Sequence, residues 1–301
     1  MRLLALLPIA LCITSLVLAF LCLFAGSRRG FMEDYAILTL NTSRLGQNIF
    51  NTTESSSNPL VNFLDNISNT IESEIQDGIT DVAQQLGIHD FYSAHLMTYC
   101  EGYYYYNNNN TRDNDNNNNN NDDEDAKKNI TKCSNRTALY NFNPQKILQQ
   151  ELDASKTGID LSDLNWPSDI STGLNALRIA AKATFVLYCI AIGFIGIALL
   201  AAVASIFFAG RLSAILNVIA DWMAFVTLGI ASAIATAVAV KGARTINKYG
   251  GEVGVSADRG NKFLVITWVA TGLLLLSSVV WCVLAVMGRR RYKAGTVPKY
   301  G

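Results

Sequence analysis

The sequence is short of charge. Only 16% of its 301 residues are charged, against about 25% in an ordinary soluble domain. The 24 basic residues balance 24 acidic ones and form no concentrated basic face, which nucleic-acid binding would require. The motifs G-x-S-x-G, P-loop and H-E-x-x-H are also absent. We therefore predict no enzymatic activity, no nucleic-acid partner and no evident small-molecule substrate.

Histidine and cysteine are scarce too. The only two histidines, His89 and His95, are too few for an ordinary metal site, and we expect them to be exposed loop residues. Four of the six cysteines lie in apolar segments, where a thiol behaves as a small hydrophobe. Only Cys100 and Cys133 lie in polar sequence. In an oxidising compartment they predict one disulfide, with two free thiols or a metal pair as alternatives. We expect no metal and no cofactor.

Long apolar runs are what the sequence has in abundance. Uncharged runs of about 18 residues or more indicate membrane spans. We predict an all-α membrane protein, a bundle of four transmembrane helices within residues 1–26, 183–210, 212–240 and 263–288. The first run could instead be a cleaved signal peptide. Its 23 uncharged residues exceed the roughly 7–15 residues of a signal's apolar region, so we favour a span.

The polar sequence lies mostly between the first two spans. Residues 26–182 hold 21 acidic and 12 basic residues, a net charge of −9. All the N-glycosylation sequons fall there, and the one at Asn109, inside an asparagine tract, is the weakest; the others are at Asn41, Asn51, Asn66, Asn129 and Asn135. We expect residues 27–182 to be a long extracellular first loop and residues 241–262 a second. The tail 289–301 and both termini are then cytosolic, an orientation that the positive-inside rule favours weakly.

Two segments of the first loop have a clear pattern. Apolar residues recur at steps of three or four across residues 60–86, which predicts an amphipathic helix. Residues 107–125 are an Asn/Asp-rich insert, with asparagine at eleven of the fifteen positions 107–121. Such a composition predicts disorder, because it cannot bury enough apolar surface.

The third span contains small residues and one charge. Gly229, Ala233 and Ala237 recur every four residues, as do Ala231, Ala235 and Ala239. Because small residues let helices approach closely in lipid, we assign helix packing to Gly229, Ala233 and Ala237. Asp221 is either an intramembrane acid, and then a functional candidate, or an interfacial one beside Trp222. We favour the interfacial position, because residues 222–240 alone suffice to cross.

Three segments together resemble the fungal Sur-seven/PalI family of four-span plasma-membrane proteins. They are residues 90–102, which contain Cys100; Cys133 with residues 140–144; and residues 247–270, which run into the fourth span with Trp281. The resemblance covers nearly the whole chain. It implies a claudin-like architecture, in which a disulfide between Cys100 and Cys133 closes the extracellular first loop.

The same resemblance implies a function. The chain is expected to be a structural protein that organises eisosome-type cortical domains of the fungal plasma membrane, with effects on the cell wall and endocytosis. Its partners would be the lipid bilayer and, by lateral association, itself or other membrane proteins. One alternative is a PalI-like accessory of an ambient-pH-sensing receptor. Another is a small channel or transporter subunit, with Asp221 facing a cavity.

Overall fold

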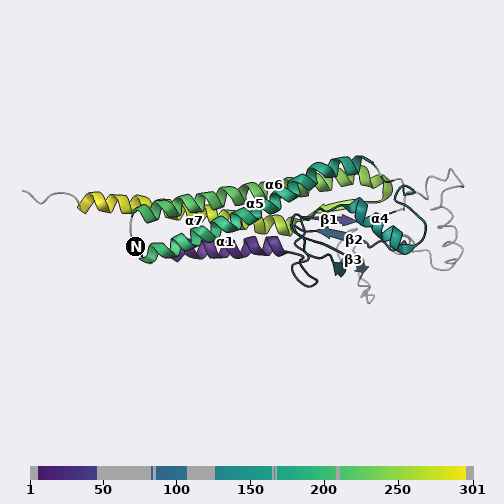
Figure 1. The fold of residues 1–301 in the computed structure, drawn as a ribbon, viewed down its shortest axis with the longest axis horizontal. Coiled ribbons are helices and arrows are strands. Elements are labelled where there is room, and N and C mark those ends of the chain that lie inside the picture. The colour runs from purple at the N-terminus through teal and green to yellow at the C-terminus, as the bar shows by residue number, and fades with distance from the viewer. Residues whose placement is uncertain are drawn as a thin grey trace, which may run out of the picture.

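The fold is an elongated helical bundle with a small β-sheet at one end (Figure 1). This computed structural model describes residues 6–45, 83, 86–106, 126–164, 166, 168–207 and 211–295. The predicted insert 107–125, and all of the predicted helix 60–86 except Ala83 and Leu86, lie outside the described residues.

Four helices among the described residues are long and apolar enough to cross a membrane. They are α1 (Leu6–Phe24), α5 (Ser168–Phe207), α6 (Arg211–Gly250) and α7 (Asn261–Gly295). The helices α5 and α6 have 40 residues each and are therefore about 60 Å long, twice the ~30 Å hydrocarbon core. Both continue past the predicted spans toward the sheet (Figure 1).

Each long helix packs on two neighbours, in the cyclic order α1, α5, α6, α7. On α6 the buried face carries Ala231, Ala235 and Ala239, each at most 1% exposed. The packing prediction is wrong for Ala233 and Ala237, which are exposed, while Gly229 is partly buried near the Thr271 methyl. The two alanine stripes differ by two residues, or about 200° around the helix, so spacing alone did not show which of them faces neighbours.

The prediction of an all-α protein is wrong at the end of the bundle. Five strands form an antiparallel sheet in the order β4-β3-β2-β1-β5. Three of them have only four residues, too few for a recognisable alternation along the chain. Their bounds are β1 Leu38–Asn41, β2 Phe91–Ala94, β3 Tyr99–Tyr106, β4 Ala126–Cys133 and β5 Ser256–Arg259.

Strand β5 comes from the short connection between α6 and α7 and pairs with β1. Each of the two predicted loops, 27–182 and 241–262, therefore contributes one or more strands to the same sheet. Gly260, which follows β5, lies so close to the neighbouring chain that a Cβ there would be 1.6 Å from the carbonyl oxygen of Ala36. Only glycine allows this approach.

One face of the sheet is covered by the short helix α4 (Pro144–Ser155) and the end of α6. The helix α4 begins at a proline, and the side chain of Asn143 caps it by accepting a hydrogen bond from the Lys146 backbone N–H at 3.3 Å. Leu148 and Leu152 from α4, Leu40 and Tyr92 from the sheet and Ile246 from α6 share one core. We call the sheet together with α4 the head of the molecule.

Candidate functional site

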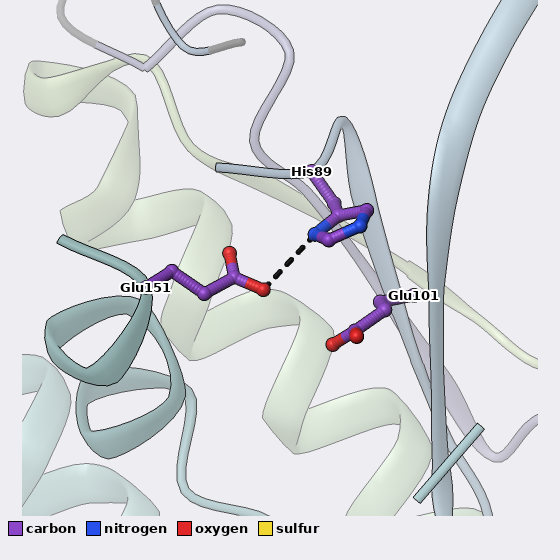
Figure 2. Close-up of side chains that lie close together, drawn as sticks. All are labelled: His89, Glu101 and Glu151. Atoms are coloured by element: carbon purple, nitrogen blue, oxygen red, sulfur yellow. Dashed lines mark hydrogen bonds and ion pairs between the residues drawn. The ribbon is translucent and has the colours of Figure 1, made fainter. Parts of the chain in front are cut away.

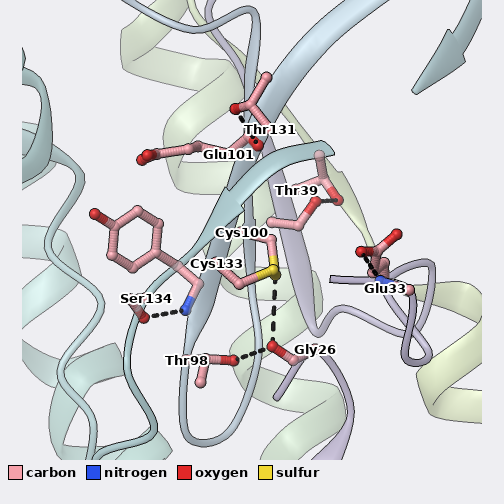
Figure 3. Close-up of a disulfide and its surroundings, with 12 residues drawn as sticks. Gly26, Glu33, Thr39, Thr98, Cys100, Glu101, Thr131, Cys133 and Ser134 are labelled. Atoms are coloured by element: carbon pink, nitrogen blue, oxygen red, sulfur yellow. Dashed lines mark hydrogen bonds between the residues drawn. A yellow bond between two sulfur atoms is a disulfide. The ribbon is translucent and has the colours of Figure 1, made fainter. Parts of the chain in front are cut away.

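The disulfide joins β3 and β4 of the head. Cys100 and Cys133 are direct partners in the register of the two strands, with Cα atoms 4.0 Å apart and an S–S bond of 2.03 Å (Figure 3). Cys100 packs against Phe91 and Ile130. The bridge therefore connects neighbouring strands, with the insert 107–125 between their far ends. The predicted pairing of Cys100 with Cys133 is present, and both cysteines lie in strands of a sheet.

Successive side chains of a strand point to opposite faces, so Glu101 lies on the face opposite Cys100. Its register partner is Tyr92, which belongs to the core under α4. The Glu101 side chain is only 6% exposed, and its ion pair with Lys132 is long at 3.7 Å. A carboxylate thus lies on the face of the sheet that packs on the core.

His89 and Glu151 meet Glu101 on this face. His89 precedes β2 and Glu151 lies on α4, and Figure 2 shows the three side chains converging on one space. The His89 Nδ1 is 2.9 Å from Glu151 Oε1. The Tyr92 hydroxyl donates a hydrogen bond to Glu151 Oε2 and accepts one from the backbone N–H of His89.

The electrostatics of this cluster favour a bound positive charge. Burial alone lowers the pKa of His89, but the hydrogen bond and the charge of Glu151 outweigh it, so the pKa is raised. The pKa of Glu101 is raised by burial first and by the negative charge of Glu151 second. Burial, followed by the charge of Glu151, likewise raises the pKa of Tyr92. Each shift favours the more protonated form. His89, Glu101 and Tyr92 thus bind their protons more tightly than the same groups do in water.

The prediction that both histidines are exposed is wrong. His89 is half-buried in the cluster just described, and His95 is only 4% exposed. Burial lowers the pKa of His95 to about 4, so its imidazole is neutral near pH 7. The His95 ring packs directly on Gly26, where a Cβ would come within 2.3 Å of it. His95 is therefore a packing residue between the end of α1 and the sheet.

Asp221 is only 1% exposed inside the bundle, and its predicted place at the membrane interface stays a prediction. Its carboxylate accepts hydrogen bonds from the Cys12 thiol at 3.2 Å and the Ser277 hydroxyl at 2.5 Å, so it joins α6 to α1 and α7. Its neighbour Trp222 is 43% exposed on the outside of the bundle. Asp221 is thus an interhelical contact within the apolar segments, and no sequence pattern named its two partners.

The sequons have different surroundings. Asn129 and Asn135 are exposed. Asn41 is partly buried, and its side-chain oxygen accepts hydrogen bonds from the backbone and hydroxyl of Ser43. The sequons at Asn51, Asn66 and Asn109 lie outside the described residues. Glycosylation stays a prediction at all of them.

We predict that replacing both bridged cysteines, by Cys100→Ser and Cys133→Ser, lowers the free energy of unfolding of the head by about 3–4 kcal/mol. The bridge closes a segment with a sequence separation of 33, and its loss returns that chain entropy to the unfolded state. Thermal unfolding in detergent micelles measures the effect as a lower Tm. The variant Cys282→Ser is the control, because Cys282 is a free cysteine in α7. An equal Tm for the double variant and the control would contradict the prediction.

We predict that Asp221→Ala destabilises the bundle by about 1–3 kcal/mol. It removes the carboxylate that accepts from the buried Cys12 thiol and Ser277 hydroxyl and leaves Ser277 the longer bond to the Pro8 carbonyl oxygen at 3.4 Å. Asp221→Asn keeps an acceptor oxygen and should cost less. Size-exclusion chromatography after heating in detergent measures how much monodisperse protein survives. The surviving fraction should fall from the wild type to Asp221→Asn and further to Asp221→Ala. Thr14→Ala is the matched control, since the Thr14 hydroxyl is exposed and bonds only the Ala10 carbonyl of its own helix. Equal losses for Asp221→Ala and Thr14→Ala would refute the structural role.

Comparison with known proteins identifies the family. The sequence matches the model of the SUR7/PalI family over residues 4–280. That range contains α1, α4, α5, α6, the whole sheet and much of α7. Neither a curated protein nor a solved structure matches the chain. With its four span-forming helices, the chain belongs to the SUR7/PalI family of multi-pass membrane proteins.

Proposed function

We propose that this protein is a non-enzymatic structural organiser of eisosome-type cortical domains of the plasma membrane, with indirect effects on the cell wall and endocytosis. Membership of the SUR7/PalI family supports the proposal. The observation that carries it is the connection between the head and the bundle. Because β5 lies between α6 and α7 and pairs with β1, the head is held directly on the spanning helices. A head fixed in this way presents a constant surface to neighbouring proteins in the membrane.

The proposed partner of the bundle is the lipid bilayer. Large apolar side chains cover its outside, a surface that water would not solvate well but lipid does. They occur on all four long helices, for example at Val17, Ile190, Leu200, Ile219, Ile230, Val265 and Val279. Lateral association with itself or with other membrane proteins would use parts of this surface together with the head.

The proposed orientation places the head outside the cell and both termini in the cytosol. A disulfide persists in an oxidising compartment, and the bridge lies in the head. The exposed Asn129 and Asn135 lie there as well. At the opposite end of the bundle, α6 begins at Arg211 and α7 ends with the basic residues 289–293, as the positive-inside rule favours for cytosolic ends.

If the head is extracellular, enzymatic removal of N-linked glycans should lower the apparent mass of the protein on a denaturing gel. We expect the double variant Asn129→Gln with Asn135→Gln to lose part of that shift, because both side chains are exposed. Thr137→Ser is the matched control, since it keeps the acceptor pattern of Asn135. An apparent mass that the enzyme leaves unchanged would contradict the proposed orientation.

Live imaging tests the organising role itself. With a fluorescent tag after Gly301 at native expression, we expect immobile cortical patches that do not recover for minutes after photobleaching. An organiser of stable domains must itself exchange slowly, because it holds the lateral contacts that define them. Membrane fractionation of the same cells should place the protein in the plasma-membrane fraction.

A diffuse signal that recovers rapidly would count against the organising role. If deletion of the gene then impaired growth only at alkaline pH, the accessory of a pH-sensing receptor would become the better proposal.

A further inference from the structure

The cluster of His89, Glu101 and Glu151 has the composition of a metal site. One nitrogen or oxygen ligand atom from each residue lies within 4.8 Å of the other two. Imidazole nitrogen with carboxylate oxygen is a ligand set suited to divalent first-row transition metals, with zinc as the common choice in proteins. The organising role proposed above makes no use of this cluster.

The three ligand residues are held by separate elements that the core fixes. His89 follows Ile88, which is fully buried. Glu101 is on β3, bound into the sheet on both sides. Glu151 precedes Leu152, which is 1% exposed in the same core. Ligands on three independently anchored elements form a pre-organised site, and a cation bound between them would join β3, the residue before β2 and α4.

A second layer of contacts orients the ligands. The Tyr92 hydroxyl donates to the second carboxylate oxygen of Glu151, Oε2, and leaves Oε1 directed at His89. The ring of Tyr103 stacks on the His89 imidazole with centroids 4.8 Å apart. Outer contacts of this kind hold metal ligands in a fixed orientation.

The two carboxylates of the cluster repel each other. Two carboxylates face each other, and one imidazole provides at most one positive charge. Lys132, the other cation near them, is 3.7 Å from Glu101 with a side chain that is 75% exposed. By contrast, the Glu101 side chain is 6% exposed. A half-buried pair of like charges is unfavourable, and a divalent cation between the carboxylates removes the repulsion.

The spacing is close to that of a bound ion. Ligand atoms at about 2.0–2.2 Å from one tetrahedral zinc ion lie about 3.4 Å apart. The His89 Nδ1 and Glu151 Oε1 are 2.9 Å apart, and no pair in the cluster exceeds 4.8 Å.

We propose that His89, Glu101 and Glu151 bind one divalent transition-metal ion, with Zn²⁺ the best fit, and that its fourth position is open to water. The ion fastens α4 to the sheet on the face opposite the disulfide. Sites with three protein ligands and one open position are an established arrangement for zinc.

The test uses the full chain in detergent micelles, purified without a polyhistidine tag and treated with a chelator. Titration with Zn²⁺ by calorimetry, and with Co²⁺ by its visible absorption, should show one ion per chain. His89→Ala and Glu151→Gln should each weaken binding by at least about tenfold. Asp153→Asn is the matched control, an exposed acid on the same helix α4, and should change the affinity less than twofold.

A measurement on the protein without substitutions tests the proposal even if the variants fail to fold. Diethyl pyrocarbonate modifies accessible histidines, and peptide mass spectrometry resolves His89 from the buried His95. Added Zn²⁺ should slow the modification of His89 at least tenfold, while added Mg²⁺ should not. Absence of saturable Zn²⁺ or Co²⁺ binding, unchanged binding by His89→Ala, or equal protection by Mg²⁺ would overturn the proposal.

Discussion

Strand β1 is hydrogen-bonded to β2 on one side and to β5 on the other, and the rest of the head depends on this double pairing. The strands β2, β3 and β4 come from the long first loop, whereas β5 lies between α6 and α7. Four-residue strands are not stable alone. They are stable here because β1 is paired on both sides, with β2 and with β5, and because α4 and the end of α6 cover one face. The long loop is thus part of the same folded body as the spanning helices.

The alternation of side chains along β3 places the disulfide on one face of the sheet and Glu101 on the other. Cys100 faces the side with the disulfide, and the next residue, Glu101, faces α4 with His89 and Glu151. The disulfide therefore fixes the strand that carries Glu101, although the two groups lie on opposite faces. The irregularity in the register at Glu101 and Gly102 adds a local constraint, since a Cβ at Gly102 would be 2.1 Å from the carbonyl oxygen of Asn129.

Buried polar groups in the bundle follow the rule that lipid imposes, namely that partners must come from within the protein. Asp221 accepts from Cys12 and Ser277. Nearer the head, Tyr188, Thr267, Ser232 and Thr271 form a second hydrogen-bonded set across α5, α6 and α7. These contacts define which faces of the helices meet. Apolar packing alone would select the helix faces less specifically.

The four spans and the two cysteines that pair could be predicted from the sequence alone. Both depend on local information: the length of an apolar run, and two cysteines in polar sequence. The sheet, the packed alanine face of α6, the burial of His95 and the surroundings of Asp221 and His89 emerge only when the chain has folded. The reason is separation along the chain. Cys12 and Asp221 are 209 residues apart, and His89 and Glu151 are 62 apart, so their contacts exist only once the helices and strands have packed.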